Sequence, residues 1–351
     1  MSLEKIRKNI DLFDSQILRL LNDRMEQALM SKKFKTKIED SDREKTLIKK
    51  IRANSTTLIN ADFIEKIYLE ILKESKSLQA KDYMVIAFRG EHGAYSEVAA
   101  AEWENAYIPV SCREYSDVLD GVHSGLYDYG IVPVENSLGG VIGEVNELLA
   151  NTDLHVVGVV ELPIYLCLLA IRDTDHREIR TVYSNSQSLA QCRNFLARNR
   201  LEPITTYDTA AAAKMIAENG LVSSAVIASS RAAEIYNLEI IKDDIDDYER
   251  NITRFLILSK EINKAAGEKC TVLFSTEHKA GTLFRVLEVF AKADINLTRI
   301  VSMPGRKSGY GFFLDFIGSS DDGNIQSALK KLEDITSNFR LMGCYKEKIV
   351  E

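Results

Sequence analysis

Polar side chains follow directly on an apolar run in the segment GIVPVENSLGG, residues 130–140. The run IVPV is typical of a buried strand, and Glu135, Asn136 and Ser137 come immediately after it. A carboxylic acid, an amide and a hydroxyl at the mouth of a buried strand are costly unless a polar partner meets them. We therefore predict that this strand end lines a ligand site. The alternative is that Asn136 and Ser137 cap a helix that begins at Val141.

Three other segments place polar groups beside expected strands. They are FRGEHGAYSEVAA (88–100), YSNSQSLAQC (183–192) and RNITRF (250–255). Ligands of open α/β sheets bind outside the carboxyl ends of the strands, and the first two segments follow strands as that rule requires. In the third segment, Thr253 and Arg254 precede their strand, which fits an antiparallel strand that crosses back into the first lobe.

The first of these turns holds two glycines and a serine in a GxxGxxS spacing. This is not the dinucleotide fingerprint, because Ser96 replaces the third glycine. Gly90 and Gly93 allow backbone amides to approach a ligand, and Ser96 is placed to cap the next helix, whose N–H groups can bind a carboxylate. In the second segment, Ser184 and Gln187 could meet a ligand or form another helix cap.

The N-terminal segment carries cations on an apolar helical face. Apolar residues recur at steps of three and four with no Pro or Gly between them, at Leu3, Ile6, Ile10, Phe13, Ile17, Leu20 and Ala28. Arg24 interrupts this stripe, and a buried arginine requires a carboxylate partner. In a helix continuous to about Lys37, Lys35 lies within ~20° of the same face. Arg7 lies ~25 Å from Arg24 along that helix, so it would join the same small site from a second chain.

Three helices are predicted at the N-terminal end. The long helix is followed by a capping box at Ser41–Glu44, which opens a second helix, and by a third helix over residues 60–79. A single helix of this length cannot bury its apolar stripe alone, so we expect the domain to dimerise through it. Glu44 has two possible roles, one in this capping box and one in a ligand pocket.

Strands and helices alternate from Tyr83 to residue 259, which indicates an α/β domain with mainly parallel strands. Residues 260–269 contain Lys, Glu, Asn and Gly and are typical of a linker. The segment 270–345 follows the order strand, helix, strand, strand, helix, strand, which predicts a ferredoxin-like unit.

Composition limits the classes of function. The 351-residue chain has a net charge of −7. Residues 1–82 contain 18 Lys/Arg and 14 Asp/Glu, a net charge of +4, so the remainder carries −11. No long basic run is present, which disfavours nucleic-acid binding, while the basic N-terminal part suits a small anionic ligand. The most apolar segment, 154–171, contains Glu161 and Pro163, so no membrane span is expected.

The cysteines are odd in number, scattered and without a CxxC pair, at Cys112, Cys167, Cys192, Cys270 and Cys344. This pattern predicts reduced thiols in a cytoplasmic protein. The N-terminal residues favour a helix over the apolar core of a signal peptide.

Residues 3–80 resemble an AroQ-type chorismate mutase in the motifs IRKNID, LLNDR, KKFK, DSDREK and ESKSLQ. The resemblance implies that Arg24 and Arg7 of the partner subunit bind the substrate carboxylates, and that Lys35 and Gln79 face the ether oxygen. It assigns the rest of the pocket to Asp40, Arg43, Glu44 and Ser75. The rearrangement of chorismate to prephenate needs no nucleophile, base, metal or cofactor, and fixed donors near the breaking C–O bond lower its barrier by ~3 kcal/mol each.

The motifs VPVENS and NITRF resemble those of prephenate dehydratase, over residues 83–260. That family folds as two α/β lobes with the substrate between them, like a type 2 periplasmic binding protein. Its reaction removes CO₂ and the ring hydroxyl of prephenate to give phenylpyruvate. The resemblance makes Thr253 essential, and we interpret it as a hydrogen-bond donor to the leaving hydroxyl because threonine is a weak acid. Glu135 is predicted to supply the proton, with its pKa raised by its apolar strand.

The remaining dehydratase residues are predicted to hold the substrate. Arg254 is expected to bind a carboxylate. Four polar residues are expected to position the substrate: Ser96, Asn136, Ser137 and Gln187. Asn185 and Ser186 stand where the family often has His-Pro, so this chain has no imidazole at that place.

Residues 270–345 resemble an ACT domain, most clearly in KAGTLFRVLEVFAKADINLTRI. Such domains pair and bind an amino acid at the pair interface, which implies L-phenylalanine, the end product, as effector. The effector site is predicted to comprise Gly281, Thr282, Leu283, Asn296, Leu297 and Ser302. The usual Glu-Ser-Arg-Pro signature reads Val301-Ser302-Met303-Pro304, without either charge. A purely structural dimerisation module is the alternative.

We predict three domains. They are an all-α AroQ-type helical domain at 1–82, an α/β two-lobed domain like a periplasmic binding protein at 83–262, and an α+β ferredoxin-like ACT domain at 268–351. The predicted function of the chain is a bifunctional enzyme of phenylalanine biosynthesis that converts chorismate to prephenate and prephenate to phenylpyruvate. A homodimer or homotetramer is expected. Three alternatives stay open: arogenate as the dehydratase substrate, an inactive helical dimerisation domain, and a non-catalytic ligand sensor.

Overall fold

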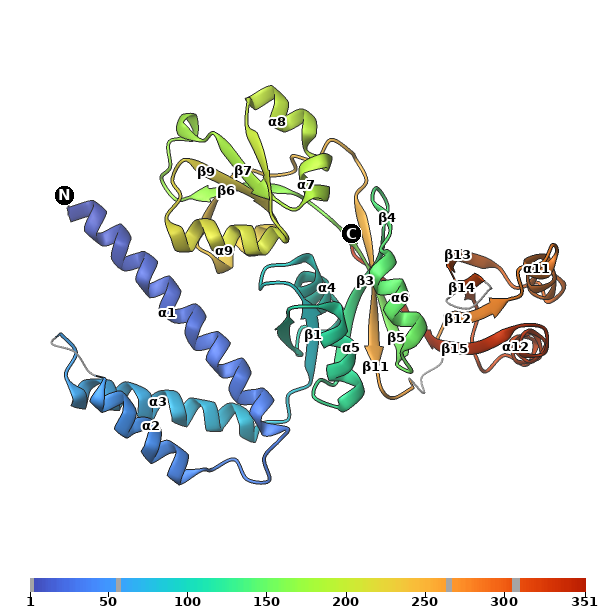
Figure 1. Ribbon diagram of the computed structural model, residues 1–351, viewed down its shortest axis with the longest axis horizontal. Helices are drawn as coiled ribbons and strands as arrows, with labels where there is room; N and C mark the ends of the chain where they lie inside the picture. The colour runs from blue at the N-terminus through green and yellow to red at the C-terminus, as the bar shows by residue number, and fades with distance from the viewer. Residues whose placement is uncertain (1–2, 55–57, 263–266, 305–309) are drawn as a thin grey trace. The chain divides into compact units, whose positions relative to one another are not determined.

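The computed structural model describes residues 3–54, 58–262, 267–304 and 310–351. Its contacts divide the chain into two compact units, Met1–Tyr83 and Met84–Glu351, whose elements are labelled in Figure 1. Part of the predicted linker, residues 263–266, lies outside the described residues. Within the described ranges, no helix is both long and apolar enough to cross a membrane.

Three helices build the first unit, as the sequence predicts: α1 (Leu3–Lys32), α2 (Ser41–Ala53) and α3 (Ala61–Ala80). α1 ends at Lys32 and not near Lys37, because its last turn loosens into i→i+3 hydrogen bonds such as Phe34 N–H to the Ser31 carbonyl at 3.2 Å. The Lys32 ammonium then donates to Asp82 at 2.9 Å, which ties the end of α1 to the segment after α3.

The capping box predicted at the start of α2 is wrong. Asp40 is the N-cap, and its carboxylate accepts a hydrogen bond from the Arg43 N–H at 3.0 Å, while Ser41 is the first helical residue. Glu44 instead forms an ion pair with Lys76 of α3 at 3.2 Å. Because Asp40 caps the helix, Glu44 is left for contacts between the helices.

The second unit begins with a mixed sheet in the order β16-β5-β11-β3-β1-β2, with β4 paired to β3. Its strands are β1 (Val85–Arg89), β2 (Ile108–Cys112), β3 (Tyr129–Asn136), β4 (Gly140–Val141), β5 (His155–Pro163), β11 (Ile252–Ser259) and β16 (Glu347–Ile349). β1 is parallel to β2 and β3, whereas β11 runs antiparallel between β3 and β5. The prediction of an antiparallel strand returning to the first lobe is therefore confirmed. Three helices accompany this sheet: α4 (Tyr95–Trp103), α5 (Tyr115–Ser124) and α6 (Gly143–Asn151).

A separate sheet in the order β10-β6-β9-β7-β8 forms the second lobe. Its strands are β6 (Cys167–Ile171), β7 (Thr181–Ser184), β8 (Glu202–Thr205), β9 (Ser224–Ala228) and β10 (Leu238–Lys242). Its helices are η1 (His176–Glu178), α7 (Ser186–Gln191), α8 (Arg193–Asn199), α9 (Thr209–Asn219) and α10 (Ser230–Ile235). The chain enters this lobe after β5 and leaves it before β11, which gives the two-lobed α/β architecture that the sequence predicts.

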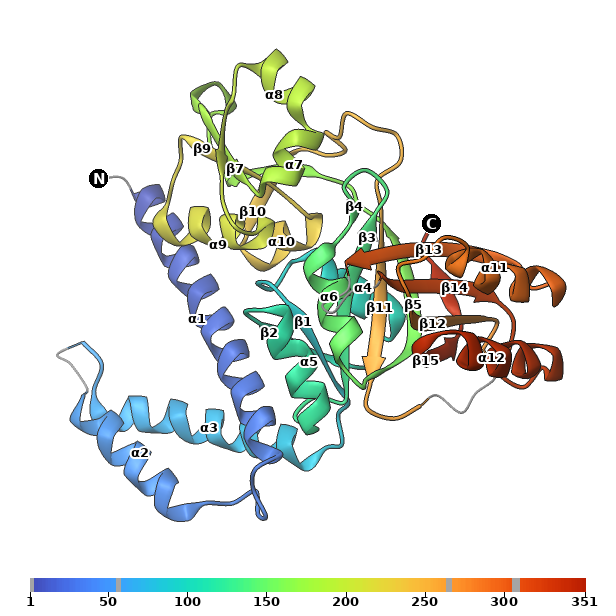
Figure 2. The ribbon, with the colours of Figure 1, turned by 45° about the vertical axis from the view of Figure 1, so that its right-hand side comes forward.

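The C-terminal segment forms the predicted ferredoxin-like unit. Its elements are β12 (Lys269–Thr276), α11 (Thr282–Lys292), β13 (Leu297–Pro304), β14 (Tyr310–Ile317), α12 (Gly323–Ile335) and β15 (Ser337–Tyr345). The four strands pair in the order β13-β14-β12-β15. Figure 2 shows α11 and α12 on the face of this sheet turned away from β11. The opposite face shares a hydrophobic core with the first lobe, in which Leu273, Phe313 and Met342 meet Val132 and Leu256.

Two cysteines are paired, which corrects the prediction that all five are reduced thiols. Cys270 of β12 and Cys344 of β15 form a disulfide between neighbouring strands of the C-terminal sheet. The other three cysteines are buried and form no disulfide among the described residues. The sequence did not show this pair because 74 residues separate its members, and only the sheet register brings them together.

Candidate active sites

A pocket of about 500 Å³ lies among the three helices of the first unit. It is lined by all the residues predicted for the mutase site except Arg7, namely Arg24, Lys35, Asp40, Arg43, Glu44, Ser75 and Gln79. Lys35 reaches it from the loop after α1 and not from the helix face on which the sequence pattern placed it. Arg7 lies near the start of the same helix, about 25 Å from Arg24 at 1.5 Å per residue.

Two polar atoms in this pocket lack the partners that burial demands. Nη1 of Arg24 and Oε1 of Gln79 are buried and have no hydrogen-bond partner among the described residues. The Gln79 amide is oriented by a bond from Nε2 to the Ser75 carbonyl at 3.2 Å. Buried polar atoms are nearly always satisfied, so an unsatisfied guanidinium and amide mark a place for a polar ligand.

A second pocket, of about 150 Å³, lies between the two lobes of the second unit. The first lobe contributes Ser96, Asn136 and Thr253, and the second lobe contributes Gln187 and Asp208. The first three side chains are buried, and Gln187 is exposed at the edge. Four of the predicted dehydratase residues, Ser96, Asn136, Gln187 and Thr253, therefore lie together.

Asn136 connects the parts of this pocket. Its Nδ2 donates to Oγ1 of Thr253 at 2.9 Å and to Oδ1 of Asn251 at 2.8 Å. Its Oδ1 accepts from the Gly139 N–H at 2.8 Å and from Nε2 of Gln187 at 3.0 Å, a contact between the lobes. Since the Thr253 oxygen accepts the amide hydrogen, its own O–H is left to donate elsewhere.

Arg89 is a pocket residue that the sequence reasoning missed. It ends β1, and its guanidinium lies over the rings of Tyr115 and Tyr207, 5.2 and 4.9 Å from their centroids. Its Nε is buried without a hydrogen-bond partner among the described residues. An arginine held between two rings with an unused donor is suited to bind a carboxylate. Its position at the carboxyl end of the first strand, directly before Gly90, is the signal that could have identified it.

Asp208 is the second residue that the sequence reasoning missed. It caps α9 by accepting from the Ala211 N–H at 2.9 Å, and burial raises the pKa of its carboxyl group. Gly90 has φ +114°, and a Cβ there would lie 3.2 Å from the Asp208 carboxylate. A glycine is therefore needed where the first lobe approaches this acid of the second lobe. Asp208 directly precedes an alanine-rich helix, where an aspartate is an ordinary N-cap, so nothing in the sequence indicated a role in the pocket.

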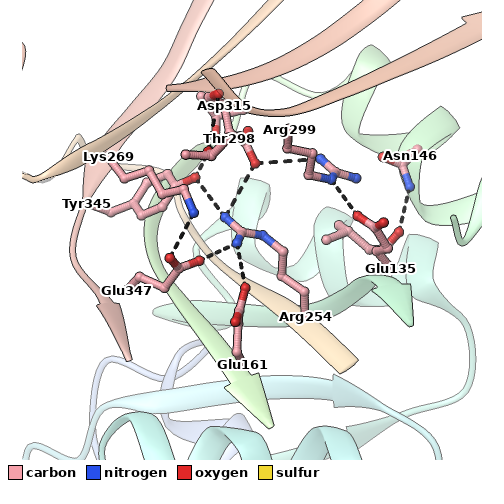
Figure 3. Close-up of polar contacts among 12 residues, drawn as sticks. Glu135, Asn146, Glu161, Arg254, Lys269, Thr298, Arg299, Asp315, Tyr345 and Glu347 are labelled. Carbon is pink, nitrogen blue, oxygen red and sulfur yellow. Dashed lines mark hydrogen bonds and ion pairs between the residues drawn. The ribbon is translucent and has the colours of Figure 1, made fainter. Parts of the chain in front are cut away.

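Glu135 and Arg254 do not lie in the pocket, contrary to prediction. They pair with each other in the strand register, while the neighbouring Thr253 and Asn136 form the next pair. Successive side chains of a strand point to opposite faces, so residues adjacent in sequence cannot both face one pocket. Figure 3 shows Glu135 and Arg254 directed towards the C-terminal sheet, where Glu135 binds Arg299 at 2.7 Å.

Ser137 is also absent from the pocket lining. Its hydroxyl accepts from the Ile252 N–H at 2.9 Å and donates to the Arg250 carbonyl at 3.3 Å. These two bonds fasten the end of β3 to the start of β11, so Ser137 supports the strand that carries Thr253.

The helix caps differ from those predicted. Ala94 and not Ser96 occupies the N-cap of α4. The helix expected from Val141 begins at Gly143, so neither Asn136 nor Ser137 caps it. Asn185 caps α7, with its Oδ1 accepting from the next helical turn. Ser96 and Gln187 are each the second residue of a helix, and Asn136 ends β3, so all three are free of a capping role and line the pocket.

The residues predicted to bind an effector lie at the start of α11 and in or next to β13. Gly281 begins α11 with φ 82°, and the Thr282 hydroxyl donates to the Lys279 carbonyl at 2.9 Å. Asn296 is exposed before β13. Ser302 instead lines a cavity of about 480 Å³ between α6 and the C-terminal sheet.

Comparisons with known proteins match three consecutive segments of the chain. Family models match in order along it: Chorismate mutase type II at residues 6–80, Prephenate dehydratase at 86–263 and ACT domain at 271–334. The bifunctional chorismate mutase/prephenate dehydratase of Aquifex aeolicus is 33% identical over 99% of both chains. Arogenate dehydratase/prephenate dehydratase 2 of Arabidopsis thaliana is 40% identical over 74% of this chain and 72% of its own length.

Among solved structures, prephenate dehydratase from Arthrobacter aurescens in complex with L-Phe is 27% identical, with a TM-score of 0.70 over 75% of this chain and 90% of its own. The order of the three family matches, the whole-chain likeness to a bifunctional enzyme and the two separate polar pockets point the same way. The chain belongs to the family of bifunctional chorismate mutase/prephenate dehydratases and carries a C-terminal ACT domain.

Proposed function

We propose that the two pockets divide the chemistry of the family, with chorismate rearranged in the helical pocket and prephenate dehydrated between the lobes. The observation that carries this proposal is the separation of the two residue sets. The mutase residues gather in the first unit, while Asn136, Thr253 and Gln187 gather in the second. No residue is shared, so each reaction can be removed without the other.

In the helical pocket, Arg24 binds one substrate carboxylate with its buried, unused Nη1. Lys35 directs its ammonium group at the ether oxygen, where negative charge develops as the C–O bond breaks. Gln79 faces the same oxygen and donates to it once its amide, whose Nε2 bonds to the Ser75 carbonyl in the single chain, has turned over. Arg43 and Ser75 complete the lining, and Lys76 fixes the carboxylate of Glu44. The pocket holds chorismate in the compact conformer from which the rearrangement proceeds.

A second copy of the chain completes the mutase site. The apolar stripe of α1 is exposed in the single chain, at Leu3, Ile10, Phe13 and Ile17. Packing this stripe against the same helix of a partner buries it and brings Arg7 of the partner subunit towards the pocket of Arg24. A homodimer is thus the smallest active form of the mutase, and pairing of ACT domains would extend it to a homotetramer.

Between the lobes, Thr253 donates its O–H to the leaving ring hydroxyl while its oxygen is held by Asn136. Arg89 binds a substrate carboxylate. Asp208 is the one carboxylic acid among the described residues that line the pocket. Its raised pKa suits it to deliver a proton to the ring hydroxyl, which then leaves as water. Loss of CO₂ and water then aromatises the ring.

Arogenate is a second candidate substrate of the lobe pocket. The likeness to the Arabidopsis thaliana arogenate dehydratase/prephenate dehydratase 2 covers this part of the chain. Arogenate differs from prephenate by an amine in place of the keto group, at a distance from the ring hydroxyl that leaves. Comparing kcat/KM for the two substrates on one preparation distinguishes them.

L-Phenylalanine is the proposed effector of the C-terminal domain. The Arthrobacter aurescens relative was solved in complex with L-Phe. In this chain, Gly281, Thr282 and Asn296 are at least partly exposed, and pairing of two C-terminal sheets would enclose them. Isothermal titration with L-phenylalanine tests this assignment, and absence of binding at millimolar concentration would leave the domain a dimerisation module. A cytoplasmic location stays a prediction, which fractionation of the source cells tests.

The proposed function is tested by supplying purified protein with chorismate and following chorismate absorbance together with phenylpyruvate in alkali. Loss of chorismate with formation of phenylpyruvate is the expected result. Loss of chorismate alone would mean that the lobe pocket does not use prephenate, and arogenate is then supplied directly. No turnover of chorismate, prephenate or arogenate would instead favour a ligand sensor.

A further inference from the structure

The face of the first-lobe sheet opposite the pocket holds a buried ionic network. Arg254 of β11 forms ion pairs with Glu161 of β5 at 3.0 Å and with Asp315 of β14 at 3.4 Å, and it also binds Glu347 of β16. Burial opposes the charge of Arg254, but Tyr345, Asp315 and the two glutamates outweigh it and raise the pKa of the guanidinium. Arg254 is therefore a permanent cation among acidic groups of three different strands.

Arg299 forms the second arm of the network. Its Nε donates to Glu135 of β3 at 2.7 Å, and its Nη1 lies 3.8 Å from Oδ2 of Asp315. Asp315 is 1% exposed, and its other oxygen accepts from the Thr271 hydroxyl at 2.7 Å. Figure 3 shows the two arginines converging on Asp315. The carboxylate of Asp315 therefore faces two guanidinium groups, that of Arg254 on β11 and that of Arg299. Arg299 in turn binds Glu135 of β3.

These ionic residues are the immediate chain neighbours of the pocket residues. Arg254 follows Thr253, and Glu135 precedes Asn136. The register pairs Thr253 with Asn136 and Arg254 with Glu135, so one pair faces the substrate pocket and the other faces the C-terminal sheet. A shift or twist of either strand end that displaced Arg254 or Glu135 would therefore also displace Thr253 or Asn136.

The strand ladder is interrupted at this point. The register between β11 and β3 shifts after Arg254, because Phe255 pairs with Pro133 and Val134 is left over as a bulge. A bulge breaks the regular hydrogen bonds and re-aims the side chains beyond it. Asn136 and Thr253 lie beyond the bulge, so contacts outside the regular β3–β11 ladder must help to fix their orientation.

The C-terminal sheet can supply such a contact because it is seated firmly on the first lobe. The two share a hydrophobic core, and β16 adds the end of the chain to β5 as a parallel edge strand. The backbone of β15 approaches so closely that a Cβ at Gly343 would lie 2.0 Å from the Val156 carbonyl oxygen. A glycine is required there to allow this contact.

We propose that Asp315, Arg299 and Glu135 are positioning residues of the dehydratase, through which the C-terminal sheet holds Asn136 and Thr253 in the geometry that dehydration requires. This inference rests on the proposed dehydratase function of the lobe pocket. The C-terminal domain is then part of the catalytic framework as well as a candidate sensor. Its edge strand β13 also connects the two roles, because Asn296 and Leu297 of the predicted effector site lie just before Arg299.

The test compares Glu135→Gln, Arg299→Gln and their double variant with wild-type protein. Each single variant breaks the ion pair between Glu135 and Arg299, and both side chains are partly accessible to solvent. A small misplacement of catalytic groups can cost about 100-fold in rate, so dehydratase kcat is expected to fall by about 10- to 100-fold, while KM for prephenate changes by less than about threefold. The double variant should lose no more than the more impaired single variant, because both changes remove the same contact.

Asp315→Asn extends the test to the centre of the network and keeps the shape of the side chain. Its dehydratase kcat should also fall, with KM nearly unchanged. The matched control is Glu277→Gln, which breaks an exposed ion pair with Lys279 in the same domain and should leave dehydratase kcat unaltered. Mutase activity of every variant and the melting temperature are measured on the same preparations. If Asp315→Asn fails to fold, the other two substitutions carry the test.

Two results would overturn the inference. The first is a dehydratase kcat within about twofold of wild type in both single variants, since a positioning contact must affect rate. The second is a double variant whose loss is the product of the two single losses, which would mean that the residues act independently. Failure of wild-type protein to turn over prephenate would be a failure of the proposed function, and the same assays show it separately.

Discussion

The amide nitrogen of Asn136 lies 2.9 Å from Oγ1 of Thr253, across a register pair of two antiparallel strands. This bond fixes the threonine oxygen as an acceptor and directs its hydrogen towards the pocket. The same amide receives Gln187 from the other lobe, so closure of the lobes and orientation of Thr253 are coupled through one side chain.

Thr253→Ala should remove dehydratase activity and leave mutase activity unchanged. Loss of one donor to a developing charge typically lowers kcat by about 100- to 1,000-fold. Thr253→Ser is the matched control, because it keeps the hydroxyl that Asn136 orients, and it should retain much of the activity. Both activities are measured with prephenate and chorismate on the same preparations. Equal rates for Ala and wild type would remove Thr253 from the mechanism.

Mixing of subunits tests the origin of Arg7 in the mutase site. Arg7→Ala and Arg24→Ala should each lose mutase activity and keep dehydratase activity. If each site combines Arg24 with Arg7 of the partner subunit, a mixed dimer contains one intact site, and exchange of equal amounts should restore about a quarter of the wild-type activity. Each variant incubated with itself is the control. No recovery after demonstrated subunit exchange would place both arginines in one chain's site or outside it.

Arg89→Ala should weaken binding of prephenate. A lost charged hydrogen bond costs about 1.5–3 kcal/mol, so KM should rise by about 10- to 100-fold with a smaller change in kcat. Arg89→Lys should recover only part of this loss, since a lysine lacks the planar fork that lies between Tyr115 and Tyr207. Arg113→Ala removes an exposed arginine after β2 and is the control. A KM for Arg89→Ala equal to that of Arg113→Ala would contradict the assignment.

The pH dependence of dehydration should report on Asp208. Burial raises the pKa of this carboxyl group, so the protonated form persists to higher pH than in an ordinary aspartic acid. If Asp208 delivers the proton, kcat/KM for prephenate falls as pH rises through that raised pKa, and Asp208→Asn lacks this limb. Mutase activity over the same pH range is the control. An unchanged profile in Asp208→Asn would assign the limb to another group.

The same shift has a consequence for stability. A carboxyl group whose pKa is raised on folding binds its proton more tightly in the native state. Its contribution to the free energy of unfolding is therefore fully present below the pKa of an unfolded aspartic acid and is lost as pH rises through the folded value. Asp208→Asn should make the melting temperature less sensitive to pH in that window, as thermal denaturation at several pH values would show.

The sequence alone determined the order of the elements and most of the mutase pocket. Local periodicity placed Arg24 on an inward helical face, and the resemblance to AroQ-type chorismate mutases supplied Arg43, Ser75 and Gln79, which line the same cavity. The polar strand ends at Asn136 and Thr253 were likewise visible, since an apolar run that stops at polar side chains is a local signal.

The tertiary structure decided which neighbours of those residues face the substrate. Adjacent strand positions point to opposite faces, and the sequence does not show which face meets the other lobe and which meets the C-terminal sheet. Glu135 and Arg254 were therefore assigned to the wrong face, and Arg89 and Asp208 were missed because separate lobes bring them together. The Cys270–Cys344 pair and the ionic contacts of Asp315 depend equally on strand register, which arises from packing between distant segments of the chain.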